Sequence, residues 1–88
     1  MVIDYKKLEE NLPKLTSEDF VAAENAICAG GNVLIDARYN SEIQLRLAAK
    51  ALDVPYPELK TLPLKDFMEL KRVVMTYFFV MDSETPTQ

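Results

Sequence analysis

Apolar residues in three stretches of this chain recur every three or four positions, the spacing that places side chains on one face of an α-helix. The first stretch follows Thr16, where the sequence T-x-x-D allows Thr16 and Asp19 to cap the first turn of a helix reciprocally. Its apolar positions are Phe20, Ala23, Ala26 and Ile27, with Val21 and Cys28 beside them. Because Gly30 and Gly31 supply a left-handed stop, we expect a helix from about residue 17 to this glycine pair.

The second stretch runs from Glu42 to about Asp53 and can be capped by Asn40 or Ser41. One line of its apolar residues is Ile43, Leu47 and Ala51, and Leu45, Ala48, Ala49 and Leu52 lie beside it. This pattern predicts a second helix. The segment before it, residues 33–39, opens with a short apolar run that does not distinguish a strand, a turn of helix and an ordered loop.

Prolines organise the chain between the second and third stretches. Pro55 and Pro57 hold Tyr56 extended, and Pro57 suits the first position of a short helix that we expect to end at Leu62. Pro63 then begins the third long helix.

The third helix carries more apolar surface than one small core requires. Its core face is expected to consist of Phe67, Leu70, Val73, Val74, Tyr77, Phe78 and Met81. A second apolar line remains at Met68, Met75 and Phe79. Two interpretations are open: the N-terminal residues or the 33–39 segment cover this line, or it forms an interface with a partner, as methionines and aromatics often do.

Together these elements predict an all-α fold, a small bundle of three main helices and one short helix. Residues 1–15 form an N-terminal arm that is either a short helix or extended, since Pro13 interrupts a mixed apolar spacing. Residues 16–81 form the helical domain. The polar residues 82–88 form a disordered tail.

The charge of the chain points to a protein partner. Its 88 residues include 14 acidic and 10 basic side chains, a net charge of −4, which disfavours binding to nucleic acid. A domain of this size buries a modest fraction of its surface, so we expect it to form a homo-oligomer. No apolar run approaches the roughly 20 residues that cross a bilayer, and the N-terminus lacks the pattern of a secretory signal. We therefore expect a cytoplasmic protein that binds no membrane.

The residues of common catalytic schemes are missing. With one cysteine and no histidine, the chain forms no internal disulfide, no histidine-based acid–base pair and no usual zinc site. Cys28 has no basic neighbour to activate its thiol, so we expect a small buried residue. The glycine pair lacks the Lys-Ser/Thr of a phosphate-binding loop, and nothing in the sequence brings Asp36 and Asp66 together. We expect no enzyme, and no catalytic, cofactor-binding or metal site.

An alternative interpretation is a small helical DNA-binding or regulatory protein. Residues 44–62 can form the first helix, turn and second helix of a helix-turn-helix that exposes Glu58, Lys60 and Thr61. Pro63 would end that second helix after about two turns, which is short for a recognition helix.

Two long segments, LTSEDFVAAENAICAGGN and EIQLRLAAKALDVPYPELKTLPLKDFMELKRVVMTYFF, together resemble the small tail assembly chaperones of contractile-type and other long-tailed bacteriophages and prophages. The shared pattern is a T-x-x-D-F/L helix start and a Gly-Gly stop. An Ala/Leu helix, a V-P turn, an L-x-x-L-P-L-x-D-F junction and a final helix ending in aromatics follow in the same order.

The resemblance implies a largely helical protein that binds the tail tape measure protein, keeps its long apolar helices from aggregating and helps recruit tail tube subunits. Such a protein acts in the cytoplasm of the host bacterium and is not retained in the mature virion. From the surplus apolar surface, and not from the family pattern, we infer that Met68, Met75 and Phe79 contact the partner. Tyr56 and Phe78 are further candidates.

Overall fold

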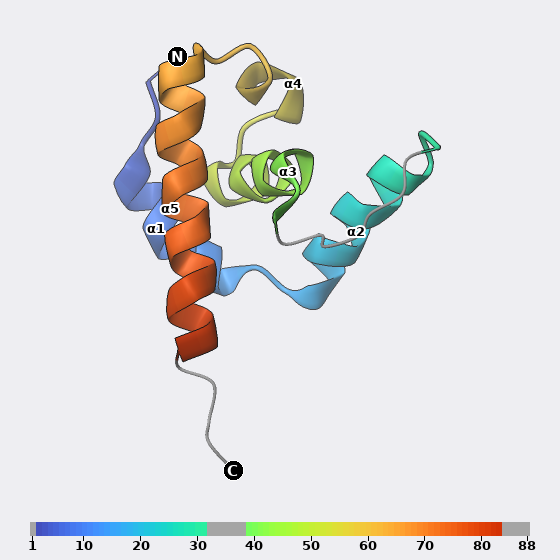
Figure 1. Cartoon of the computed structure of the whole chain (residues 1–88), viewed down its shortest axis with the longest axis horizontal. Coiled ribbons are helices and arrows are strands. Elements are labelled where there is room, and N and C mark those ends of the chain that lie inside the picture. Colours follow the sequence, from blue (N-terminus) through green and yellow to red (C-terminus); the bar gives the residue numbers. More distant parts are fainter. Residues whose placement is uncertain (1, 32–38, 84–88) are drawn as a thin grey trace.

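The computed structural model describes residues 2–31 and 39–83, and this part of the chain contains helices and no strand (Figure 1). The helices are α1 (Tyr5–Asn11), the 3-10 helix η1 (Leu12–Lys14), α2 (Ser17–Cys28), α3 (Ser41–Leu52), α4 (Tyr56–Leu59) and α5 (Leu64–Ser83). The all-α prediction is confirmed. The predicted set of three main helices and one short helix is incomplete, because α1 is a further helix.

Local sequence signals set the ends of the longer helices. The backbone N–H of Thr16 donates to the Asp19 carboxylate at 2.8 Å and forms part of the predicted capping box at the start of α2. At the start of α3, Oδ1 of Asn40 accepts from two backbone N–H groups of the first turn, at 2.9 and 3.1 Å. After α2, Gly31 adopts a φ of +89°, the left-handed conformation expected of the glycine stop.

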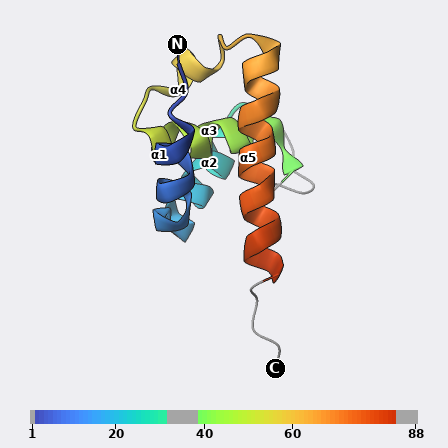
Figure 2. The ribbon, with the colours of Figure 1, turned by 90° about the vertical axis from the view of Figure 1, so that its left-hand side faces the viewer.

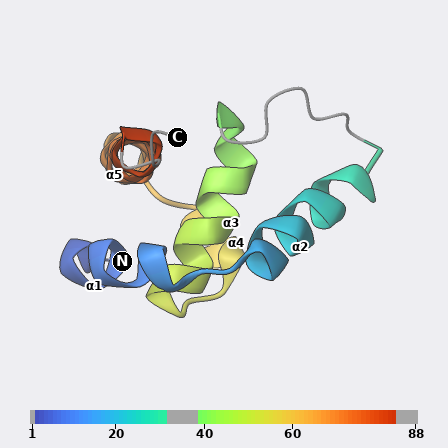
Figure 3. The same cartoon turned by 90° about the horizontal axis from the view of Figure 1, so that it is seen from below.

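The helix at the centre of the fold is α3. It contacts α1, α2, α4 and α5, and Figure 3 shows it between α2 on one side and α1 and α5 on the other. Its buried residues are Ile43, Gln44, Leu47, Ala48, Ala49, Ala51 and Leu52. The three alanines allow neighbouring backbones to approach α3 closely, because the distance between packed helices depends on the side chains at their contact.

The N-terminal residues belong to the same core. Ile3, Leu8 and Leu12 are buried, and the side-chain amide of Asn11 donates to the backbone carbonyl of Ala51 in α3 at 2.8 Å. Of the two predicted conformations of this segment, the short helix is the one present. It lies beside α5, with α3 crossing behind both (Figure 2).

The short helix α4 begins close to the predicted residue but ends earlier than predicted. The prediction that Tyr56 is extended is wrong, because Tyr56 is the first residue of α4, with Pro57 in the first turn. The helix ends at Leu59 instead of Leu62. The following proline is one physical reason: Pro63 has no N–H, so it cannot donate to the carbonyl of Leu59 and continue the helix.

The long helix α5 has the predicted core face along most of its length. The buried residues of that face are Leu70, Val73, Val74 and Phe78. Phe67 and Tyr77 are half-buried. Met81 is 38% exposed, contrary to the prediction, because the end of α5 extends past the helices that cover its middle (Figure 2). The helix includes Asp82 and Ser83, which we expected in the tail, and residues 84–88 lie outside the described residues.

The prediction that Cys28 is buried is wrong. α2 packs on α3 through its buried residues Ala23 and Ile27, and Cys28 follows Ile27 by about 100° around the helix, so its side chain is exposed. Residues 32–38, including Asp36, lie outside the described part of the chain. Among the described helices, none combines the length and the apolar character needed to cross a membrane.

Candidate partner-binding surface

An apolar groove of about 410 Å³ lies between the C-terminal half of α5 and the connection from η1 to α2. Its lining residues are Leu12, Leu15, Thr16, Ser17, Phe20, Leu47, Tyr77, Phe78 and Met81. All except Thr16 and Ser17 contribute aliphatic or aromatic side chains. We call this feature the α5–α2 groove.

The core of the protein forms the floor of this groove. Leu12, Leu47 and Phe78 are almost fully buried, so close packing fixes their positions. Leu15 and Phe20 are half-buried beside them. A groove with a firm floor and a flexible methionine, Met81, at its edge suits the binding of apolar side chains.

The sequence at the start of α2 builds one wall of the groove. Leu15 directly precedes the N-cap residue Thr16, and Phe20 is the fourth residue of the helix. This spacing is that of a hydrophobic staple, in which the residue before the cap packs against the fourth helical residue. From this wall α2 leads away from α5 (Figures 1 and 3), so the groove stays open to solvent.

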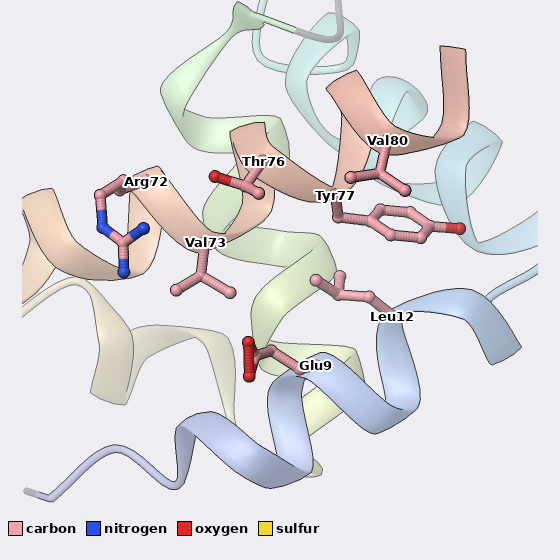
Figure 4. A pocket seen from close by; sticks show the side chains of 7 residues that line it. All are labelled: Glu9, Leu12, Arg72, Val73, Thr76, Tyr77 and Val80. Atoms are coloured by element: carbon pink, nitrogen blue, oxygen red, sulfur yellow. The ribbon is translucent and has the colours of Figure 1, made fainter. Parts of the chain in front are cut away.

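A smaller cavity of about 190 Å³ lies between α1 and α5, on the other side of Tyr77. Figure 4 shows Glu9 and Leu12 facing the α5 residues Val73 and Tyr77 across it. Because Leu12 and Tyr77 line both cavities, apolar surface continues around α5 from one cavity to the other. Val80, which is half exposed, borders the smaller one.

Charged side chains flank the smaller cavity. Nε of Arg72 donates to both carboxylate oxygens of Glu69 at 3.2 Å. This hydrogen bonding lowers the pKa of Glu69 and raises the pKa of Arg72, to which Glu9 also contributes. Burial raises the pKa of the nearby Tyr5 hydroxyl, and the charge of Asp66 adds to the effect. Glu69, Arg72 and Tyr5 therefore keep their usual charge at neutral pH.

In the predicted line of Met68, Met75 and Phe79, the first and last side chains are exposed and Met75 is partly covered. Met68 is 52% exposed and Phe79 is 61% exposed. Met75 is half-buried against the core, where its Sδ accepts a hydrogen bond from Nε2 of Gln44 in α3 at 2.8 Å. This contact comes from α3, and not from the N-terminal residues or the 33–39 segment that we considered as a cover for the line.

The two further candidates, Phe78 and Tyr56, lie in different surroundings. Phe78 forms part of the groove floor, and its ring packs against that of Tyr77 with centroids 5.9 Å apart. Tyr56 lies in α4, half-buried, with the guanidinium of Arg46 4.1 Å from the centre of its ring. Burial, followed by the charge of Glu42, raises the pKa of the Tyr56 hydroxyl. Tyr56 thus does not line the α5–α2 groove.

The sequence interpretation missed the groove residues that come from the N-terminal part of the chain. Leu12, Leu15 and Phe20 were not among the predicted interface residues, although all three line the groove. The available signal was the leucine just before the T-x-x-D box together with the aromatic at the fourth helical position, which is the staple pattern.

The segment proposed as a helix-turn-helix has a largely buried first helix, α3, and a mostly exposed second part in which Glu58, Lys60 and Thr61 are accessible. α3 is the most buried helix of the fold, and α4 has four residues, about one turn. Lys60 lies with its Nζ 5.5 Å from the centre of the Tyr56 ring. Within residues 2–31 and 39–83, no cluster of acidic, cysteine or histidine side chains is arranged to hold a metal ion.

Comparison with protein-family models, with curated proteins and with solved structures finds no match for this chain.

Proposed function

We propose that this protein is a non-enzymatic tail assembly chaperone, which binds a helix of the tape measure protein in the α5–α2 groove and helps recruit tail tube subunits. The groove is the observation that carries the proposal, since seven of its nine lining residues are aliphatic or aromatic. The resemblance of the sequence to small tail assembly chaperones supports the identity of the partner. The protein acts in the host cytoplasm and leaves before the virion is complete.

The mode of binding is that of an amphipathic helix in a groove. The apolar stripe of such a helix inserts side chains every three or four residues, and Met81 can adapt to them at the edge of the groove. Each aliphatic side chain that becomes fully buried contributes about 1.5–3 kcal/mol. Two or three such anchors supply about 3–9 kcal/mol, which is of the same order as the entropy lost on association, so binding of one helix in one groove should be weak and reversible.

Binding of this kind explains a chaperone activity without chemistry. While its apolar stripe lies in the groove, a tape measure helix cannot pair with another apolar helix and aggregate. The partner helix leaves when a tube subunit or a neighbouring tape measure helix offers a larger apolar contact. No bond needs to be made or broken at any step.

The test is co-expression with the tape measure protein encoded in the same genome, followed by affinity purification. Wild-type protein should retain the tape measure protein in soluble form. Met81→Glu places a charge at the edge of the groove and should reduce retention at least about tenfold, because a buried unpaired charge is costly. Circular dichroism should show that the variant is folded, since Met81 is partly exposed.

The matched control is Val21→Glu. Val21 is also an exposed apolar residue of a helix, 49% accessible, and it does not line the groove. This variant should retain the tape measure protein as the wild type does. Equal retention by the Met81→Glu variant, or equal loss in both variants, would contradict the proposal. DNA binding that weakens with increasing salt would instead support the alternative of a DNA-binding protein.

A further inference from the structure

One side of α5 carries an apolar stripe that the core covers only in part, at Met75. The stripe consists of Leu64, Met68, Met75 and Phe79, of which Leu64 is 67% exposed. At about 100° per residue, these four side chains fall within a sector of roughly 60°. Figure 3, which looks along α5, shows α1 and α3 on one side of this helix, and the opposite side is not covered by any helix of the described residues. None of these four residues lines the α5–α2 groove.

The spacing of the stripe residues along α5 is the same from either end of the helix. Successive members are four, seven and four residues apart, so the midpoint lies between Lys71 and Arg72. A two-fold axis through this midpoint, perpendicular to α5, would set two copies of the helix antiparallel. Leu64 would then oppose the partner's Phe79, and Met68 would oppose the partner's Met75. A symmetric dimer requires this kind of self-complementary surface.

The charges beside the stripe fit the same symmetry. Glu69 and Arg72 form an exposed ion pair on one edge of the stripe. In the antiparallel arrangement, Arg72 and the partner's Glu69 lie on the same edge of the interface. Their positions along the helix axis differ by two residues, which is about 3 Å at a rise of 1.5 Å per residue. Each guanidinium can therefore bridge its own Glu69 and the partner's Glu69. On the other edge, Nζ of Lys71 is directed to α3, where it donates to Oγ of Ser41 at 2.9 Å.

We propose that a second copy of this chain covers the stripe, in an antiparallel α5–α5 dimer with two-fold symmetry. The interface is small, four apolar side chains and one ion pair from each copy, so it belongs to the class of weak and transient contacts. The dissociation constant should be in the micromolar range or weaker. Both α5–α2 grooves stay open and lie toward opposite ends of the antiparallel pair, so the dimer is bivalent for a long helical partner.

The first test is sedimentation equilibrium of the purified protein over a concentration range from about ten micromolar to one millimolar, chosen to bracket a weak dimer. A monomer–dimer equilibrium is expected. Met68→Glu should weaken dimerisation at least tenfold, because it buries a carboxylate opposite the partner's Met75. Val21→Glu, an equivalent change at an exposed apolar residue on α2, should dimerise like the wild type. A protein that stays monomeric throughout, or a Met68→Glu variant that dimerises normally, would overturn the proposal.

Charge exchange tests the symmetry. Glu69→Arg alone and Arg72→Glu alone should each weaken the dimer, because each leaves charges of only one sign on this edge of both copies. The double variant Glu69→Arg/Arg72→Glu restores one acid and one base on the edge and should recover most of the lost affinity. A double variant as weak as the single variants would rule out the paired arrangement of these charges.

Cysteine crosslinking tests the antiparallel direction, in a Cys28→Ser background that removes the exposed native thiol. An equimolar mixture of Met68→Cys and Met75→Cys proteins should form a disulfide-linked dimer under mild oxidation. Either protein alone should crosslink much less, because its two thiols would be about 10 Å apart along the helix axis. Equal crosslinking in the single-variant samples would exclude this register. Met81→Glu should leave the dimer unchanged, so failure of the groove and failure of the dimer can be told apart.

Discussion

The helices α3 and α5 differ in how much of their apolar surface the fold covers. In α3, seven of the twelve residues are buried. α5 is 20 residues long and rich in aromatics and methionine, yet Met68, Phe79 and Val80 are exposed along it. The difference follows from position, because four helices pack around α3 whereas α5 has α1 and α3 on one side only. Apolar surface that the core does not need is therefore concentrated on α5.

Truncation of a buried residue in α3 should have the largest effect on stability. Ile43 is fully buried, so Ile43→Ala should lower the free energy of unfolding by about 3–4 kcal/mol through lost burial and a residual cavity. Met68→Ala, at an exposed position of α5, should change it by less than about 0.5 kcal/mol. Urea denaturation at a concentration that favours monomers measures both. If both variants lost a similar amount of unfolding free energy, α3 and α5 would not differ in how much apolar surface the fold covers.

Substitution of Met75 should reduce stability by an amount between those expected for Ile43 and Met68. Met75→Glu replaces a half-buried thioether, which accepts a hydrogen bond from Gln44, with a carboxylate against the core. We expect a loss of about 2 kcal/mol or more, because the charged group loses part of its hydration. Met68→Glu should unfold at nearly the same urea concentration as the wild type. Unchanged stability of the Met75→Glu variant would mean that α3 does not hold this residue.

The cap of α3 should contribute a smaller amount. The Asn40 side chain satisfies two backbone N–H groups that the helix itself leaves without partners. Asn40→Ala should therefore destabilise the protein by about 1 kcal/mol, and Asn40→Asp should restore most of the loss. Thermal or urea unfolding of the three proteins checks this order, and equal stability of the alanine variant would show that the cap is not needed.

The ion pair on the exposed side of α5 should give the smallest effect, and one that depends on pH. Hydrogen bonding to Arg72 lowers the pKa of Glu69 in the folded state. The stabilisation is therefore present above the ordinary glutamate pKa and is lost as the pH falls through the lowered value. Glu69→Gln should be slightly less stable than the wild type at pH 7, and the two should converge in acid. A difference that persists at low pH would point to another cause.

Much of the fold could be predicted from local sequence, because its signals act within a few residues. The cap at Thr16 and Asp19, the stop at Gly31 and the core face around Leu70 and Val74 are examples. Local signals do not reveal contacts between residues that are distant in the sequence. Met75 is covered by Gln44, 31 positions away, and Cys28 is exposed because α2 contacts little besides α3.

The candidate site was only partly predictable for the same reason. The surplus of apolar residues on α5 was visible in the sequence, and Phe78 does line the groove. The other side of the groove comes from Leu12, Leu15 and Phe20, about 60 residues earlier in the chain. Periodicity along one helix cannot show which distant segment will lie beside it.

The central claim is that a helical partner occupies the α5–α2 groove. The most direct measurement is a two-dimensional amide NMR titration of the labelled protein with a peptide that corresponds to an amphipathic helix of the tape measure protein. Amide signals of groove residues such as Leu15, Phe20 and Met81 should shift progressively, while those of α4 should change little. Shifts centred on α4, or no shifts at all, would contradict the claim.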